Sequence, residues 1–246
     1  MRPPGEAGRP AGRGSTTVLV TGGAGFIGSH VCEALLGRGE TVVCLDNFDD
    51  FYAPGIKRRN LAGALRHPGF ALAEGDLRDA GGLEALFRRH PVDAVLHLAA
   101  RAGVRPSIRQ PALYADVNVT GTARLLEAAR QAGVRRFLFG SSSSVYGART
   151  GLPFKETDEV DAPASPYAAT KRAGELLCRV THVLSGMAVT CLRFFTVYGP
   201  RQRPEMAIHT FTRLIEAGKP VPLFGDGSTA RDYTYIDDIV AGVLGA

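Results

Sequence analysis

Tyr167 and Lys171 are the two side chains of this 246-residue sequence whose types and spacing best suit proton chemistry. They lie four residues apart in a stretch whose pattern predicts a helix over 165–184, so they share one face of that helix. An ammonium group beside a phenol stabilises the phenolate, and we expect Lys171 to lower the pKa of Tyr167 from about 10 towards neutrality. The pair therefore predicts a general base that removes a proton from a hydroxyl group.

Three glycines, Gly22, Gly25 and Gly28, stand between a β-branched run at 16–21 and a helical pattern at 26–36. In that context the first glycine permits a tight turn, the second lets backbone approach a pyrophosphate, and the third lets helix and strand pack closely. The N-terminus of the helix adds unpaired N–H groups and the positive end of its dipole. The pattern predicts a dinucleotide-binding turn.

Asp46 follows the second predicted strand, 41–45, at the distance where dinucleotide folds place an acidic residue. A carboxylate there can accept hydrogen bonds from ribose hydroxyls and would repel a 2′-phosphate, which favours NAD over NADP as the cofactor. An ordinary strand-end turn is the alternative role for this side chain.

Strands and helices alternate along the first 195 residues. Strands are predicted at 16–21, 41–45, 70–73, 94–98, 137–140 and 188–194, and helices at 26–36, 82–89, 113–131 and 165–184. This alternation predicts an α/β fold with a doubly wound, parallel, Rossmann-type sheet that is covered by helices on both faces.

Proline and glycine punctuate the chain after residue 195, with one predicted helix at 207–217 and one short strand at 233–236. We expect three parts: a disordered tail at 1–14, an NAD-binding domain at 15–195, and a smaller substrate-binding lobe at 196–246. The sequence stops in a helix that has just begun at Asp237, so we expect the lobe to be incomplete.

Composition excludes several functional classes. The formal charge is +5, but no basic stripe carries interleaved aromatics, so we expect no nucleic-acid partner. No apolar stretch approaches the ~20 residues of a membrane span. The four cysteines are Cys32, Cys44, Cys178 and Cys191, which lack metal-ligand spacing. They predict free thiols in a cytoplasmic protein and no metal site.

Together these residues resemble the extended short-chain dehydrogenase/reductase family, and specifically its nucleotide-sugar epimerases, from about residue 16 to the C-terminus. The motifs that carry the resemblance lie at 21–28, 75–77, 97–100, 118–122, 141–147, 167–171, 192–200 and 231–238. The resemblance implies that Ser142 completes a catalytic triad with Tyr167 and Lys171. It also implies an NAD site formed by Gly22, Gly25, Phe26, Ile27, Gly28, Asp46, Asn47, Asp76, Leu77, Leu98, Ala99, Ala100 and Lys171. Asn118 is expected to order the fold.

The reaction implied by the resemblance is an inversion at C4 of a sugar. Tyr167 removes a hydroxyl proton while C4 gives hydride to NAD, the 4-keto sugar turns over, and hydride returns to its other face. The related 4,6-dehydratases carry Asp-Glu at the places of Ser143 and Ser144, so a dehydratase is disfavoured.

The segments 192–200 and 203–207 are similar to those of UDP-glucuronate 4-epimerases, and many UDP-galactose/glucose enzymes have Asn in place of Thr196. A substrate carboxylate suits hydroxyls and a guanidinium, which Ser143, Ser144, Thr196 and Arg203 can supply. Arg231 is expected to hold the nucleotide diphosphate. The expected partners are a UDP-sugar and a second copy of the chain. UDP-glucose/galactose 4-epimerisation and an inactive NAD-binding fragment stay open as alternatives.

Overall fold

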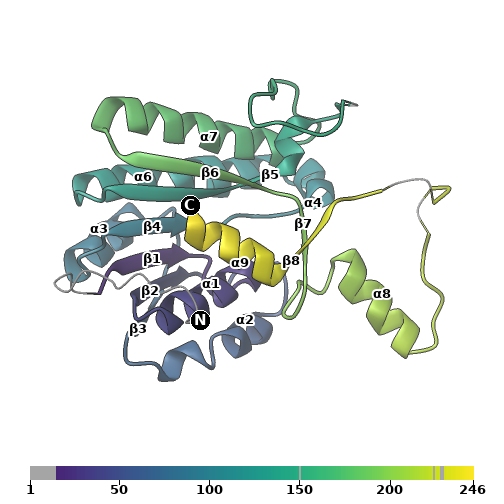
Figure 1. The fold of residues 1–246 in the computed structure, drawn as a ribbon, viewed down its shortest axis with the longest axis horizontal. Coiled ribbons are helices and arrows are strands. Elements are labelled where there is room, and N and C mark those ends of the chain that lie inside the picture. The colour runs from purple at the N-terminus through teal and green to yellow at the C-terminus, as the bar shows by residue number, and fades with distance from the viewer. Residues whose placement is uncertain (1–14, 150, 224, 228–229) are drawn as a thin grey trace, which may run out of the picture.

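The computed structural model describes residues 15–149, 151–223, 225–227 and 230–246, so the tail predicted at 1–14 lies outside the described residues. Six parallel strands form one sheet in the order β3-β2-β1-β4-β5-β6 (Figure 1). Their bounds are β1 Thr17–Thr21, β2 Thr41–Asp46, β3 Phe70–Glu74, β4 Ala94–His97, β5 Arg136–Ser142 and β6 Ala188–Phe194. This order is that of a doubly wound dinucleotide-binding sheet, which confirms the predicted fold class.

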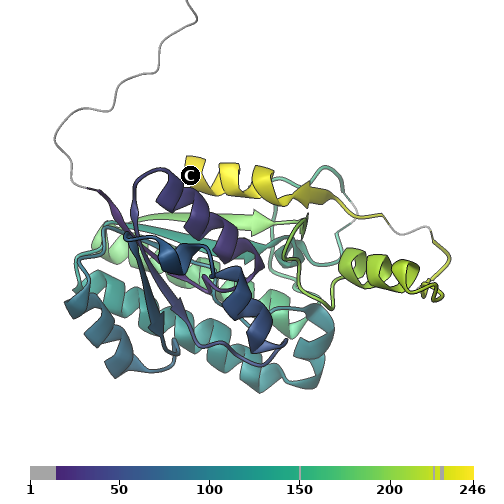
Figure 2. The ribbon, with the colours of Figure 1, turned by 90° about the horizontal axis from the view of Figure 1, so that it is seen from below.

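Side chains of each strand alternate between two apolar layers, as the two-residue period of a strand requires. Leu19 of β1 faces the layer covered by α3 (Ala80–Arg89), α6 (Gly121–Gln131) and α7 (Pro166–Ser185). Val18 and Val20 face the opposite layer, which is covered by α1 (Phe26–Gly37), the segment that follows α2 (Pro54–Asn60), and α9 (Ile236–Gly245). Figure 2 shows these two helical layers on either side of the sheet. A strand that is buried on both faces is mainly apolar, which explains why the strands could be predicted from the sequence.

The helix predicted at 113–131 is interrupted. The chain forms α5 (Pro111–Ala115), a π-helical turn over Asp116–Thr120, and then α6. Asn118 lies in the π turn and is buried, where Oδ1 accepts a hydrogen bond from the Arg101 backbone N–H at 2.8 Å. Its amide group donates to the Arg101 carbonyl at 3.0 Å and to Thr170 at 3.0 Å. The π turn thus places an amide that ties three segments together, in the ordering role expected for Asn118.

The C-terminal residues divide between a small separate sheet and the main fold. β7 (Thr196–Tyr198) pairs in parallel with β8 (Tyr233–Tyr235), and α8 (Ala207–Glu216) projects away from the main sheet (Figure 1). By contrast, α9 packs on α1, and its Val243 is 5% exposed within the apolar layer of that face. The boundary predicted at residue 195 therefore does not separate α9 from the sheet, and the division into domains stays a prediction.

Three shorter elements complete the path, α4 (Val104–Arg109) and 3₁₀ turns at Ala64–Arg66 and Ser143–Tyr146. No helix in the described part of the chain is long and apolar enough to cross a membrane. The described residues also contain no group of three or more His, Cys, Asp or Glu side chains suited to a metal ion.

Candidate active site

The glycine turn connects β1 to α1 at the carboxyl edge of the sheet. Gly22 has φ of 69°, and a Cβ there would lie 2.7 Å from the Ala99 nitrogen, so glycine is required at this position. A Cβ on Gly28 would collide with the Gly22 carbonyl oxygen. Gly25 is the N-cap of α1, which has neither a side-chain cap nor an acidic residue in its first turn. Its first N–H groups therefore form a cradle for an anion.

Asp46 ends β2 and lies beside this turn with 7% of its surface exposed. Its Oδ2 accepts a hydrogen bond from the Ala24 N–H at 3.0 Å, and its Oδ1 accepts one from the Phe48 N–H at 2.9 Å. Burial raises the pKa of this carboxyl group, and the two backbone N–H groups and the Lys57 ammonium oppose the rise. Each carboxylate oxygen can accept a further hydrogen bond, so a contact with ribose hydroxyls stays a prediction.

The next strand end carries Asp76, which is held in place by two neighbours. Arg78 donates to both of its oxygens, each at 2.9 Å, and Asn47 donates to Oδ2 at 2.9 Å. These hydrogen bonds hold the pKa of Asp76 well below its usual range. Asn47 and Asp76 therefore form a fixed polar wall between the ends of β2 and β3.

A buried histidine supports the loop after β4. His97 is fully buried, with Nδ1 2.7 Å from the Thr21 hydroxyl and Nε2 2.9 Å from the Thr122 hydroxyl. Burial lowers the pKa of this imidazole to about 3, so it is neutral. Thr21 in turn accepts a hydrogen bond from the Ala99 N–H at 3.2 Å. The chain of hydrogen bonds fixes the loop that carries residues 98–100.

The three predicted catalytic side chains come from β5 and α7. Ser142 is the last residue of β5, and its hydroxyl donates a hydrogen bond to the Ser144 hydroxyl at 3.1 Å. Ser165 caps α7 by accepting from the Ala168 N–H at 3.1 Å, and the helix begins at Pro166, one residue before Tyr167. Lys171 is buried one turn further on, and its Nζ donates to the Gly140 carbonyl at 2.7 Å. The geometry brings all three to one wall of one cavity.

The predicted effect of Lys171 on Tyr167 is wrong for this arrangement. Burial raises the pKa of Tyr167, while the Ser142 hydroxyl and the charge of Arg203 oppose the rise. The Lys171 Nζ is engaged by the Gly140 carbonyl and lies 6.0 Å from the centre of the Tyr167 ring. Burial also lowers the pKa of Lys171 itself to about 8. Desolvation outweighs these opposing effects, and the helical spacing could not reveal it.

Glu175, one turn beyond Lys171, anchors α7 to both neighbouring strands. Its side chain is 6% exposed and accepts a hydrogen bond from the Ser141 hydroxyl at 2.6 Å. Arg193 of β6 donates to both carboxylate oxygens at 2.9 and 3.0 Å, and Arg172 donates at 3.2 Å. These four hydrogen bonds to one buried carboxylate fix the position of α7 relative to β5, the strand that ends in Ser142.

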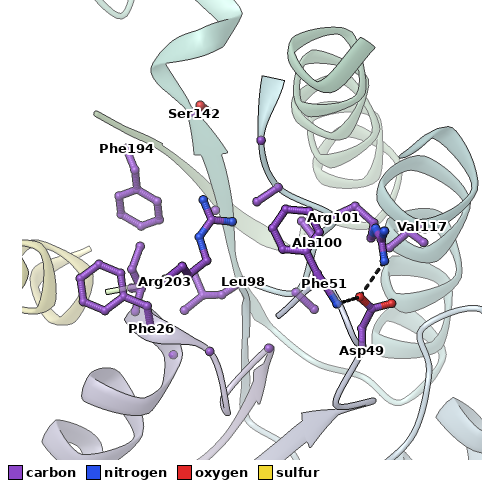
Figure 3. A pocket seen from close by; sticks show the side chains of 18 of the residues that line it. Phe26, Asp49, Phe51, Leu98, Ala100, Arg101, Val117, Ser142, Phe194 and Arg203 are labelled. Atoms are coloured by element: carbon purple, nitrogen blue, oxygen red, sulfur yellow. Dashed lines mark hydrogen bonds and ion pairs between the residues drawn. The ribbon is translucent and has the colours of Figure 1, made fainter. Parts of the chain in front are cut away.

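These elements enclose a cavity of about 480 Å³, part of whose lining is drawn in Figure 3. The predicted catalytic and cofactor residues all line it, and so do Ser143, Ser144, Thr196 and Arg203 from the predicted substrate set. Arg231 is the exception. It is exposed, does not line this cavity, and donates to the Ala230 carbonyl at 2.7 Å. The structure does not bring Arg231 to the site, and its contact with a diphosphate stays a prediction.

Several lining residues were absent from the sequence-based site. Asp49, Phe51 and Lys57 come from the segment after Asp46, and Arg101 directly follows Ala100. Asp49 and Arg101 form an ion pair of 2.6 Å, which is seen beside Phe51 in Figure 3. Their positions directly after predicted strand ends were a usable signal, because the carboxyl ends of parallel strands form the ligand crevice.

Comparisons with known proteins agree with this geometry. Residues 18–246 match the family described as the NAD dependent epimerase/dehydratase family. The chain belongs to this family. It is 49% identical to UDP-glucuronate 4-epimerase 3 of Arabidopsis thaliana over 234 residues, which cover 94% of this chain and 54% of that protein. The chain thus spans about half the length of this curated relative. The similarity confirms the resemblance to UDP-glucuronate 4-epimerases.

Solved structures of the family have the same fold. The UDP-glucuronic acid 4-epimerase of Bacillus cereus, in complex with UDP-glucuronic acid and NAD, superposes with a TM-score of 0.86 at 40% identity. That match covers 93% of this chain and 72% of the other. The UDP-glucose 4-epimerase of Thermotoga maritima, with UDP-glucose, gives a TM-score of 0.85 at 37% identity and covers the same shares, 93% and 72%.

Proposed function

We propose that the protein catalyses NAD-dependent 4-epimerisation of a UDP-sugar, between UDP-glucuronate and UDP-galacturonate, through a transient 4-keto sugar. The observation that carries the proposal is that one cavity contains both a dinucleotide cradle and the Ser142, Tyr167 and Lys171 side chains. A cofactor seated on the cradle would share the cavity with a sugar beside Tyr167. Relatives of the same family that bind UDP-glucuronic acid and NAD support the proposal.

The residues present fit NAD. The uncapped first turn of α1 and the glycine cradle suit a pyrophosphate. Asp46 and Asn47 would hold the adenine ribose, Asp76 and Leu77 the adenine, and residues 98–100 the middle of the cofactor. The Asp46 carboxylate at the end of β2 favours NAD over NADP. When bound, NAD would accept hydride from C4 of the sugar and return it.

The chain's own residues handle the proton. Ser142 and Tyr167 line the same cavity, and the Ser142 hydroxyl would orient the phenol and a sugar hydroxyl together. Tyr167 would take the C4 hydroxyl proton as the carbonyl forms and return it as the hydroxyl is restored. Because burial raises the pKa of Tyr167, a cation must stabilise its anionic form. The charge of Arg203 opposes the rise, and this residue lines the same cavity.

We infer the identity of the sugar from the hydroxyls and the charge of the residues that are predicted to bind substrate. The Ser143, Ser144 and Thr196 hydroxyls line the cavity together with the Arg203 guanidinium. This set suits the additional carboxylate of a uronic acid, since hydrogen bonds between ionised partners are the strongest kind. UDP-glucose/galactose 4-epimerisation is the second candidate, and the similarity to the Thermotoga maritima enzyme favours it.

We also propose a cytoplasmic homodimer. The outer face of α7 presents an exposed apolar stripe, formed by Leu176, Val180, Val183 and Leu184, whose exposed fractions run from 46% to 79%. A helix face of this kind is suited to burial against a second copy of the chain.

All four cysteines are free, in keeping with a reducing compartment. The absence of a nucleic-acid partner stays a prediction.

The test is conversion of UDP-sugars by the purified protein with no NADH added. We expect UDP-glucuronate to give UDP-galacturonate, as resolved by chromatography, faster than UDP-glucose gives UDP-galactose. The Tyr167→Phe variant is the matched control, because it removes one oxygen and little packing. It should lose at least about 100-fold in rate, the scale of general acid–base catalysis, and still bind NAD. Binding of NAD without turnover of any UDP-sugar would identify a non-catalytic NAD-binding chain instead.

A further inference from the structure

Asp49 and Arg101 connect the loops that follow β2 and β4. The Asp49 Oδ1 accepts a hydrogen bond from the Arg101 Nη1 at 2.6 Å, and the side chains are 28% and 14% exposed. β2 and β4 are the two neighbours of β1 in the sheet, and the glycine turn follows β1. The ion pair therefore joins the loops on either side of that turn. We call this pair the Asp49–Arg101 strap.

Each end of the strap is fixed to its own element. The Asp49 Oδ1 also accepts from the Phe51 N–H at 2.9 Å, and the Asp49 carbonyl accepts from Lys57 of α2 at 2.7 Å. At the other end, the backbone N–H and carbonyl of Arg101 are both bonded to the side chain of Asn118. A pair anchored in this way is already ordered, so its formation costs little further side-chain entropy.

The aromatic ring of Phe51 connects the strap with Arg203, one of the residues that are predicted to bind substrate. The Arg101 guanidinium lies 5.3 Å from the centre of this ring, and the Arg203 guanidinium lies 5.7 Å from it. Arg101, Phe51 and Arg203 line the same cavity as the glycine turn. Figure 3 shows Asp49 and Phe51 together with both arginines.

We propose that the Asp49–Arg101 strap retains the dinucleotide in its cleft, an inference that rests on the proposed function. A cycle that takes hydride from a sugar and returns it to the same sugar fails if the reduced cofactor leaves between the two steps. A link between the loops that flank the pyrophosphate cradle slows that loss, because the loops must separate before the ligand departs. Asp49 also neutralises Arg101, which would weaken a direct contact of this arginine with an anion but suits a closure between loops.

The test is the rate of NADH release from the purified chain. The protein is loaded with NADH and mixed with excess NAD in a stopped-flow instrument, and the decay of bound NADH fluorescence gives the release rate. Asp49→Asn keeps the size of the side chain and removes its charge, and Arg101→Gln removes the charge and shortens the side chain. We expect each to speed release about tenfold, as expected for the loss of one charge-assisted hydrogen bond. The double variant should release no faster than either single variant, because both changes break the same link.

The matched control is the ion pair of Arg58 with Glu74, which joins α2 to β3 and does not line the cavity. Arg58→Gln and Glu74→Gln should leave the release rate unchanged, and thermal melts should show every variant folded. Unchanged release from the Asp49→Asn and Arg101→Gln variants would overturn the inference. Faster release from Arg101→Gln alone would overturn it too, since Arg101 would then be a direct anion ligand. If the unaltered chain binds no NADH, the proposed function falls as well.

Discussion

Replacement of Glu175 by alanine tests how strongly α7 is fixed to the strands that carry the catalytic serine. The Glu175 carboxylate is 6% exposed and accepts four hydrogen bonds, two of them from Arg193, whose side chain is 16% exposed. The change leaves the Arg193 charge partly buried with no carboxylate opposite it. Breaking one side of a buried ion pair costs about 3–5 kcal/mol. For a chain of this size, the corresponding fall in Tm is on the order of 10 °C.

Urea titration and a thermal melt of the 246-residue chain measure this loss. Glu175→Gln should fall between the wild type and Glu175→Ala, because the amide keeps one acceptor for Arg193 or Ser141. Glu74→Gln is the comparison at an exposed pair, with side chains 54% and 55% exposed, and should change stability far less, because water solvates both charges. A Glu175→Ala chain as stable as the Glu74→Gln chain would refute the reasoning, because water or another acceptor would then satisfy Arg193 at no cost.

Three further predictions concern the cavity. Arg203→Ala should lower kcat/KM for UDP-glucuronate by about 30- to 1,000-fold, which corresponds to about 2–4 kcal/mol. It should lower kcat/KM for UDP-glucose far less. Equal losses would assign Arg203 to a contact that both substrates share. NADP should bind about 100-fold or more weakly than NAD in calorimetry, because a 2′-phosphate would approach the Asp46 carboxylate, and equal affinities would remove Asp46 from that role. Burial lowers the pKa of Lys171 from 10.5 to about 8. Between these pH values the unfolded chain binds more protons at this residue than the folded chain does. Lys171 therefore makes the free energy of unfolding rise from pH 8 to 10.5. Urea titrations of Lys171→Met should show a smaller rise over the same window, and an identical rise would contradict the assignment.

The parts of the fold that the sequence revealed are those governed by local pattern. The strand predicted at 188–194 has the bounds of β6, because a mainly apolar run that follows Gly186 is typical of a strand. The π turn at Asp116–Thr120 could not be predicted in the same way. Its Asn118 donates hydrogen bonds to the Arg101 carbonyl and to Thr170, residues that lie far away in the chain.

The site shows the same division. Spacing alone placed Tyr167 and Lys171 on one face of a helix, and both line the cavity as predicted. Their pKa values depend on burial and on the Gly140 carbonyl, which only the packing of α7 on β5 determines. The partnership of Asp49 with Arg101 was equally hidden, because it joins two loops across a third strand.

The packing of α9 on α1 bears on the order in which the protein acquires its structure. The Arg38 guanidinium donates to the Leu244 carbonyl at 3.4 Å across 206 residues of sequence, so one layer of the sheet is closed by the last described helix. Contacts this distant in sequence are slow to form, since the intervening chain must first be brought together. During synthesis, the apolar surface of α1 and β1 stays uncovered until α9 has left the ribosome. Over that interval this surface is a target for chaperones and a site of aggregation.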